Sequence, residues 1–408
     1  MNTNSPRYDV AIIGGGVFGC SIARLLSSQT DLTICLLEKE YHLAEHQSGR
    51  NSGTIHPGLA IHLEPGTRKA RFGVEGGPKL REYCYENSLP INDCGMMVVG
   101  TTAAEVKQLE TVATRTEALG VDVRWLDECE IEDQAPSVQG HQALYTPESA
   151  TVDGQAITYA FAKEAWQNGV RFYLGHTVQS LKRRKNKINI GTDKGTIVAD
   201  CVVNAAGSWG LRLAHQLDLA DQYHMVGLRG QYYELTLGNN RTFETNVYPT
   251  SMPPRIPNSV GVHFTPRPDG KVIVGPTGML AKGPDTYGRT DVDLGHLRRT
   301  VSSPNFWKFL ADPNTMRIAW DELNKTYRKP TFVERCRRLV PDIRADELAQ
   351  SYVGIAPAYV NHQGEVVKES VFVEGARSLH ILRPKPGLTA AISIGEYACD
   401  RVETILAK

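Results

Sequence analysis

The sequence predicts an α/β fold, α+β overall, in which a nucleotide-binding domain carries an inserted β-rich domain. Three observations support this expectation. A βαβ pattern with a glycine-rich turn occupies residues 8–38, a buried strand opening onto a second glycine turn ends at residue 207, and a β-rich block extends from residue 225 to about residue 340. The length agrees, because 408 residues suffice for two domains of ordinary size.

The N-terminal unit has the order strand, glycine turn, helix and strand that defines a βαβ unit. In its spacing Gly14-x-Gly16-x-x-Gly19, the first glycine permits the tight turn and the second lets the backbone approach a pyrophosphate at the positive end of the helix. The third lets that helix pack on the strand. Glu38 closes the second strand, where it can accept hydrogen bonds from adenosine ribose hydroxyls. The pattern predicts a Rossmann-type dinucleotide site, whose binding residues are Gly14, Gly16, Val17, Phe18, Gly19, Glu38 and Lys39.

The dinucleotide is expected to be FAD rather than NAD. The glycine turn lies at the extreme N-terminus, and the segment Val202-Val203-Asn204-Ala205-Ala206-Gly207 supplies the later strand and turn that lie against the dinucleotide in flavoproteins. No second Gly-x-Gly-x-x-Gly exists for a separate nicotinamide domain. We therefore expect a Rossmann-type FAD-binding domain built from residues 1–85, 141–225 and 346–408, with an inserted β-rich substrate domain at 86–140 and 226–345.

Between these landmarks the apolar periodicity predicts further elements. Helices are expected over 65–87, 105–119, 154–168 and 389–406, and strands at 94–100, 170–174, 178–181, 188–190, 196–198, 231–237, 260–264 and 271–275. The basic run at 182–187 is expected to be the solvated tip of a hairpin.

The composition excludes several classes of function. Lys and Arg number 45, as do Asp and Glu, so nothing indicates a nucleic-acid partner. The eight cysteines have no metal-ligand spacing, and no metal site is expected. The N-terminus lacks a signal or transit sequence, which favours a cytoplasmic location. No apolar stretch is long enough to span a bilayer, so any contact with the inner membrane would be peripheral.

The resemblance to a known family is first seen at residues 46–58, His-Gln-Ser-Gly-Arg-Asn-Ser-Gly-Thr-Ile-His-Pro-Gly. This stretch is similar to the D-amino-acid-oxidase-like FAD-dependent oxidoreductases, and specifically to the branch of L-2-hydroxyglutarate dehydrogenases and oxidases. The resemblance covers nearly the whole chain. The string Gly-Val-His-Phe-Thr-Pro-Arg at 261–267 is its most specific motif, and the other matching stretches are 228–233, 246–249, 268–270 and 274–276.

The resemblance implies where the flavin is held. His56 would lie near its reacting edge, and the C-terminal turn Pro386-Gly387-Leu388-Thr389 would begin a helix whose positive end faces the N1/O2 edge, where negative charge develops on reduction. Further flavin contacts are implied for Ser48, Arg50, Asn51, Ser52, Val178, Ala206, Gly207, Gly387, Leu388 and Thr389.

Two departures from the family pattern concern the substrate. Where the hydroxyglutarate enzymes carry an Arg and a Gln, this chain has Ala356-Pro357-Ala358, and where they have aromatic residues it has Leu59-Ala60-Ile61. A dicarboxylate needs cationic or multiple-donor partners at both ends. The missing Arg therefore bears on how the glutarate tail is recognised. It bears less on the class of reaction.

Oxidation of a 2-hydroxy acid needs a base for the hydroxyl proton and a partner for the carboxylate. We expect His56 or His263 as the base, because a neutral histidine titrates near neutral pH, and Arg229, Tyr248 or Arg267 as carboxylate partners. Each has a structural alternative. His263 could be a hydrogen-bonded core residue, His56 could hold the flavin without taking a proton, and Tyr248 could be core packing.

The two arginines have alternatives as well. Arg229 precedes Gly230 in an expected turn, where it could pair with a surface carboxylate. Arg267 lies beside the hairpin turn Pro268-Asp269-Gly270, and we expect it to be exposed.

Three classes of function follow from these features. The first is oxidation of L-2-hydroxyglutarate to 2-oxoglutarate, or of a related small 2-hydroxy acid, by hydride transfer to flavin N5, with oxygen or a quinone as electron acceptor. The second is oxidation of an amino acid, an amine or glycerol 3-phosphate on the same scaffold. The third, a flavin-bound protein without catalysis, is disfavoured because the nucleotide residues and the ring-edge histidine are intact.

Overall fold

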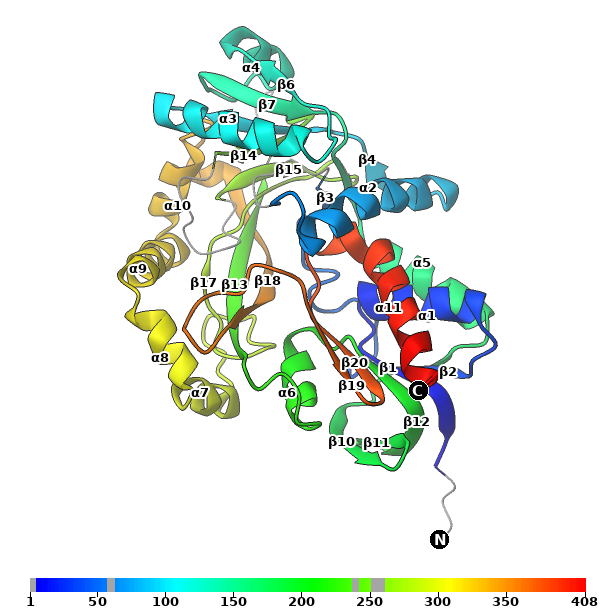
Figure 1. Ribbon diagram of the computed structural model, residues 1–408. Coiled ribbons are helices and arrows are strands. Elements are labelled where there is room, and N and C mark those ends of the chain that lie inside the picture. The colour runs from blue at the N-terminus through cyan, green and yellow to red at the C-terminus, as the bar shows by residue number, and fades with distance from the viewer. Residues whose placement is uncertain (1–4, 57–62, 237–241, 251–260) are drawn as a thin grey trace.

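The computed structural model describes residues 5–56, 63–236, 242–250 and 261–408, which form two large sheets and one small sheet with helices around them (Figure 1). The strands of the first large sheet come from residues 7–37, 171–204 and 371–383, and those of the second come from 96–146 and 224–360. In the described part of the chain, no helix combines the length and the apolar composition that crossing a membrane requires.

The first sheet has the order β10-β11-β12-β1-β2-β9, and β20 joins it by pairing with β12. β1 runs parallel to β2 and β12, and β12 runs parallel to β20. The loops that follow these four strands therefore emerge at one edge of the sheet, where open α/β sheets bind their ligands. The strands are β1 Arg7–Ile13, β2 Ile34–Leu37, β9 Arg171–Tyr173, β10 Val178–Arg184, β11 Lys187–Thr192, β12 Gly195–Asn204, β19 Val371–Gly375 and β20 Ser378–Arg383.

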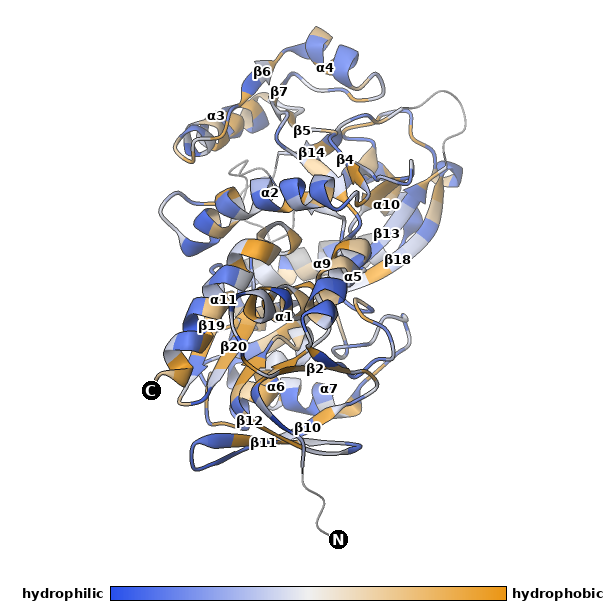
Figure 2. Ribbon diagram, turned by 90° about the vertical axis from the view of Figure 1, so that its right-hand side faces the viewer, coloured by the Kyte–Doolittle hydropathy of each residue, from blue (hydrophilic) through white to orange (hydrophobic). Residues whose placement is uncertain are grey.

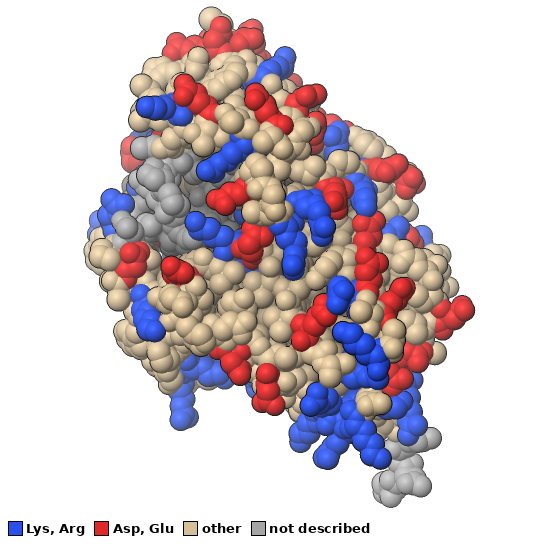
Figure 3. Space-filling view, in the orientation of Figure 1, with Lys and Arg blue, Asp and Glu red and all other residues tan. Residues whose placement is uncertain are grey.

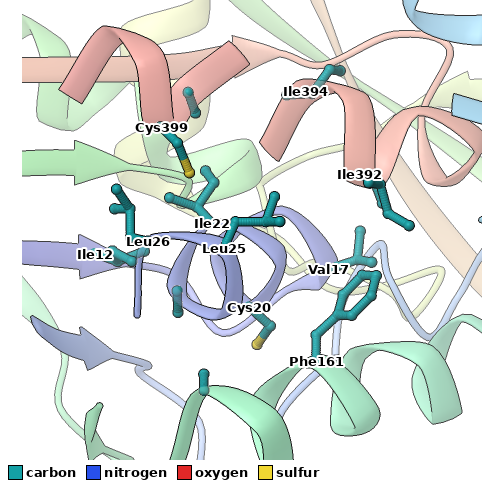
Figure 4. Close-up of a cluster of buried hydrophobic side chains, with 14 of the residues drawn as sticks. Ile12, Val17, Cys20, Ile22, Leu25, Leu26, Phe161, Ile392, Ile394 and Cys399 are labelled. Atoms are coloured by element: carbon teal, nitrogen blue, oxygen red, sulfur yellow. The ribbon is translucent and has the colours of Figure 1, made fainter. Parts of the chain in front are cut away.

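Three helices cover one face of this sheet: α1 Val17–Gln29, α5 Gly154–Gln167 and α11 Ala391–Leu406. α1 lies between the other two, and its side chains Cys20, Ile22 and Leu26 are fully buried (Figure 4). Apolar residues on two opposite sides of α1 explain this central position, because both sides lose contact with water. Figure 2 shows hydrophobic residues along β12 and β20 and hydrophilic residues on the outer faces of α2 and α3.

On the opposite face, side chains of the β10–β11 hairpin, which continues the sheet beyond β12, pack with those of β1, β2 and α6 Gly210–His215. α6 follows the short helix η1 Gly207–Trp209. The basic run 182–187 forms the end of this hairpin, as expected, and its lysines and arginines are exposed. Figure 3 shows the resulting gathering of positive side chains over β10 and β11.

The second large sheet has the order β17-β13-β16-β15-β14-β5-β7-β6, and the long strand β18 pairs antiparallel with β13. Its strands are β5 Met96–Gly100, β6 Arg124–Leu126, β7 Gln142–Thr146, β13 His224–Leu235, β14 Asn246–Pro249, β15 His263–Pro266, β16 Val272–Gly275, β17 Met279–Leu280 and β18 Leu348–Val360. The helices beside it are α3 Ala103–Glu117, α4 Glu128–Gln134, α7 Leu294–Val301, α8 Pro304–Ala311, α9 Pro313–Tyr327, α10 Lys329–Cys336 and η2 Ala345–Glu347.

The small sheet, with β3 Thr54–Ile55, β8 Ala150–Val152 and β4 Ile91–Asn92, lies beside α2 Arg68–Glu86. α2 packs against η3 Leu388–Ala390, the short helix that precedes α11. The contact is close because Gly76 has no side chain. A Cβ atom at this position would lie 2.6 Å from the carbonyl oxygen of Thr389 and 2.9 Å from the Cα of Ala390.

This close approach predicts that Gly76→Ala lowers the free energy of unfolding by about 1–3 kcal/mol, because backbone atoms on both sides must move apart. Gly77→Ala is the matched control in the same helix, since its Cβ would make ordinary contacts at 3.5 Å and beyond. We expect the control to be neutral or more stable by up to about 1 kcal/mol, from its higher helix propensity. Urea denaturation measures both, and equal stabilities would contradict the assigned contact.

Candidate active site

A cavity of about 1210 Å³ opens at the edge of the first sheet where β1, β2, β12 and β20 end, and it extends to the second sheet. Gly14 and Glu38 line it on the first side, and Tyr248 and His263 line it on the other. A dinucleotide and a small substrate can both be accommodated, because drug-sized ligands occupy cavities of roughly 300–1,000 Å³.

The glycine turn after β1 is held by direct backbone contacts. Gly14 has a φ of 113°, and a Cβ atom there would lie 2.4 Å from the carbonyl oxygen of Ala205, in the turn after β12. A Cβ atom on Gly19 would lie 1.9 Å from the carbonyl oxygen of Gly14. No side chain fits at either position, so the two turns and the start of α1 form one compact unit.

The start of α1 faces the cavity through Gly16, its N-cap residue. The hydroxyl of Ser48 accepts a hydrogen bond from the backbone N–H of Val17 at 2.9 Å, and a Cβ atom on Gly16 would meet that hydroxyl at 2.9 Å. The Cβ-free approach and the positive end of the helix suit a pyrophosphate.

Glu38 stands at the end of β2 with its carboxylate held by two backbone donors. One oxygen accepts the N–H of Gly15 at 2.6 Å, and the other accepts the N–H of Glu40 at 2.8 Å. A carboxylate has about four acceptor positions, so the oriented group keeps capacity for ribose hydroxyls. The glycine cradle and this carboxylate fit an FAD molecule, whose redox-active ring would reach the second sheet.

Most of the sequence-predicted residues meet in this cavity. Those that line it are Gly14, Gly16, Val17, Phe18, Glu38, Lys39, Ser48, Arg50, Asn51, Ser52, His56, Val178, Ala206, Gly207, Arg229, Tyr248, His263, Gly387 and Leu388. Gly19, Arg267 and Thr389 do not line it. Gly19 supports the glycine turn, and the hydroxyl of Thr389 accepts a hydrogen bond from the backbone N–H of His56 at 3.0 Å.

His56, Tyr248 and His263 form a cluster on the cavity wall. The rings of Tyr248 and His263 stack with centroids 4.3 Å apart and an interplanar angle of 6°, and His56 meets Tyr248 edge-on at 6.1 Å. Nδ1 of His263 is 2.8 Å from the hydroxyl of Thr265, which fixes the ring. His263 is therefore both a hydrogen-bonded residue and a wall of the cavity.

Both histidines are neutral at physiological pH. Burial, together with the positive charges of Lys385 and Lys69, lowers the pKa of His56 to about 4. Burial also lowers the pKa of His263 to about 3, with His56 contributing. A neutral imidazole can accept a proton, so either ring has the protonation state that a general base requires. Burial raises the pKa of Tyr248 to about 12, which keeps its hydroxyl a hydrogen-bond donor.

The expectation that Arg229 lies in a turn is wrong. It lies inside β13, paired with Ile355 of β18, and is buried. Nε and Nη2 of its guanidinium donate to the backbone oxygen of Tyr287, at 2.9 and 2.7 Å. Arg229 therefore fixes the loop that carries Tyr287. The error arose because Gly230 was interpreted as a turn residue although the strand continues through it.

The expectation that Arg267 is exposed is also corrected, because the residue is half-buried. It begins the hairpin loop between β15 and β16, where its N–H donates to the carbonyl oxygen of Lys271 at 2.7 Å. Its guanidinium lies beside Tyr352, where burial raises the pKa of the phenol and the arginine opposes that shift.

The structure adds three cations that sequence reasoning missed: Lys69 on α2, Arg383 at the end of β20 and Lys385 in the turn after it. Arg383 and Lys385 line the cavity, and so does Ala356, the first residue of the segment in which the sequence departs from the expected pattern. The one available signal was the position of Lys385, directly before the predicted flavin turn. The other departure, Leu59-Ala60-Ile61, lies outside the described residues.

Comparison with known proteins agrees with this geometry. A family model described as FAD dependent oxidoreductase, DAO, matches residues 9–401. L-2-hydroxyglutarate dehydrogenase of Escherichia coli strain K12 is 30% identical over 403 residues, which cover 98% of this chain and 94% of that protein. The mitochondrial L-2-hydroxyglutarate dehydrogenase of Nematostella vectensis is 29% identical over 97% of this chain and 91% of its own length.

Solved structures show the same fold. L-α-glycerophosphate oxidase from Mycoplasma pneumoniae with FAD bound superposes with a TM-score of 0.78 at 24% identity, and glycine oxidase from Geobacillus kaustophilus does so with 0.73 at 20% identity. Each alignment covers 98% of this chain and 95% of the other. These two likenesses establish the architecture.

The cradle around Gly16 predicts that Gly16→Ala weakens FAD binding without unfolding the protein. An added methyl group would meet the movable hydroxyl of Ser48 and occupy space that the pyrophosphate of FAD needs. We expect an FAD Kd higher by about 10–100-fold, which corresponds to roughly 1.4–2.8 kcal/mol. Titration of the apoprotein with FAD, followed by fluorescence quenching, measures this. Unchanged affinity would place the pyrophosphate elsewhere.

Proposed function

The chain belongs to the DAO family of FAD-dependent oxidoreductases, and from this premise we propose that it oxidises a small 2-hydroxy acid, specifically L-2-hydroxyglutarate to 2-oxoglutarate. The cluster of neutral His56 and His263 with Tyr248, on the cavity wall facing the cofactor cradle, carries the proposal. The substrate comes from the relatives, because they are named L-2-hydroxyglutarate dehydrogenases over nearly the whole length of the chain.

In this proposal the protein contributes a base, an orientation and a shielded cavity. Bound flavin supplies the redox chemistry by accepting a hydride at N5. His56 or His263 removes the hydroxyl proton, and the hydroxyl of Tyr248 donates to the carboxylate next to the reacting carbon. Residues 1–85, 141–225 and 346–408 would hold FAD, and residues 86–140 and 226–345 would hold the substrate. The expected bounds differ from the sheets at β7 and β18, which belong to the second sheet and would lie on the substrate side.

Electrons then pass to an acceptor, for which we propose a quinone at a membrane surface rather than oxygen. Seven of the twelve large hydrophobic side chains that are exposed in the described part of the chain lie between Val292 and Trp320. Met316 and Trp320 belong both to this surface and to the cavity wall, and Arg298, Arg299 and Arg317 on the same helices are exposed. Exposed apolar side chains together with basic residues suit a peripheral contact with anionic lipids.

The substrate assignment predicts that anaerobic L-2-hydroxyglutarate bleaches the visible spectrum of the purified holoenzyme. D-2-hydroxyglutarate, glycerol 3-phosphate and a panel of amino acids should not. Bleaching by only one of these others would retain the flavin mechanism and replace the substrate. Stopped-flow mixing of the reduced enzyme with a soluble quinone or with air-saturated buffer then compares the acceptors. Faster reoxidation by oxygen would contradict the proposal that a quinone is the acceptor.

The base assignment predicts that His56→Ala lowers kcat by about 10²–10⁴-fold, the usual contribution of a general base, while FAD remains bound. Wild-type kcat/KM should fall only as the pH drops towards about 4, because the histidine must be neutral to accept a proton and its pKa is lowered. His42→Ala is the control, since His42 is exposed and outside the cavity wall. Unchanged turnover of the His56 variant would transfer the role to His263.

A further inference from the structure

Lys385 is a cation held in place at the wall of the cavity. Its backbone is fixed by a single side chain, because the hydroxyl of Ser370 donates to the carbonyl oxygen of Lys385 at 2.9 Å and accepts from its N–H at 3.2 Å. The next residue, Pro386, packs against Gly73 of α2, where an added Cβ atom would lie 3.1 Å from the proline ring. The start of this side chain is therefore preorganised by its surroundings.

The surroundings of Lys385 are positively charged. Arg383 and Lys69 are the two charges that act on its ammonium, and both disfavour protonation. The carboxylate of Glu369 acts on Lys69 and Arg383, and that of Glu64 acts on Lys69. Among the residues that the structure describes, the ammonium of Lys385 has no hydrogen bond or ion pair. Burial lowers the pKa of Lys385 to about 7, and a bound carboxylate would offset that loss of charge.

The position of Lys385 relative to the reacting centre follows from the C-terminal turn. The hydroxyl of Thr389, four residues further along, accepts a hydrogen bond from the backbone N–H of His56. The charge of Lys385 lowers the pKa of His56 more than the charge of Lys69 does. Because His56, His263 and Lys385 line one cavity, a substrate whose hydroxyl faces the histidines can direct its other end towards Lys385. Ala356 lines the same cavity, where its methyl side chain leaves room that an arginine would occupy.

From this arrangement we propose that Lys385 binds the far carboxylate of a dicarboxylic 2-hydroxy acid, with Arg383 and Lys69 supplying additional positive potential. The lysine thereby selects a substrate with a second negative charge over one with an apolar tail. This inference rests on the proposed function, because it assumes that the reacting end lies at His56 and His263. It assigns the recognition that the missing arginine would have provided to a residue on a different strand end.

The test compares Lys385→Met with the wild-type holoenzyme on two substrates that differ only at the tail. L-2-hydroxyglutarate ends in a carboxylate, and L-2-hydroxyvalerate ends in a methyl group. We expect kcat/KM for the glutarate to fall by about 10–100-fold, the range of a charge-assisted hydrogen bond, mainly through KM. The valerate value should stay within about threefold, and Lys385→Arg should restore much of the glutarate activity.

Controls and a binding measurement keep the result interpretable. Lys79→Met removes a half-buried lysine that pairs with Glu396 outside the cavity, and it should leave kcat/KM for both substrates unchanged. Calorimetric titration of glutarate, which lacks the reacting hydroxyl, should show a Kd raised by a similar factor in Lys385→Met. Circular dichroism and FAD content verify that each variant is folded and loaded.

Two outcomes would overturn the inference. An equal loss on both substrates with a lowered flavin reduction potential would place the lysine at the flavin ring. An unchanged Kd for glutarate in Lys385→Met would show that Lys385 does not bind the far carboxylate. If no 2-hydroxy acid reduces the wild-type enzyme, the proposed function fails, and the glutarate titration still decides whether Lys385 holds a dicarboxylate.

Discussion

The backbone of Gly14 packs directly against the backbone of Ala205, and the cofactor half of the cavity depends on this contact. An added Cβ atom would come within 2.4 Å of the Ala205 carbonyl oxygen, so the turns after β1 and β12 can meet only through glycine. Because these strands are parallel, their following loops share one edge with Glu38 after β2 and with the turn after β20. The two glycine turns, the carboxylate of Glu38 and the cation after β20 are thereby collected from four separate parts of the chain.

The second sheet completes the site by close contacts with the first half. Tyr352 of β18 donates its hydroxyl hydrogen to the backbone oxygen of Asn51 at 2.8 Å, which joins the long strand to the cavity-lining segment around Asn51. Arg229 of β13 holds the loop of Tyr287, and the Tyr287 hydroxyl lies 2.6 Å from Nδ1 of His46. These bonds fix the distance between the glycine turn at Gly16 and the cluster of His56, Tyr248 and His263. The proposed hydride transfer requires such a fixed distance between bound partners.

Electrostatics in the cavity links proton removal with substrate charge. The positive charge of Lys385 lowers the pKa of His56 and so favours the neutral ring that can act as a base. A carboxylate bound at the lysine would offset that charge and make the ring more basic once the substrate is present. In the proposed reaction the lysine would thus add to burial in disfavouring a protonated His56 in the empty site, and a bound dicarboxylate would favour proton uptake.

Local pattern alone determined the βαβ unit, its glycine roles and the acid at the end of β2, because a tight turn and a strand-end position depend only on near neighbours in the chain. The same local reasoning misplaced Arg229, since Gly230 indicates a turn unless pairing with β18 is known. Only the tertiary structure decided the cation cluster, which unites Lys69 with Arg383 and Lys385 from opposite ends of the sequence. Burial and charge proximity arise from packing between distant segments, and no spacing along the chain encodes them.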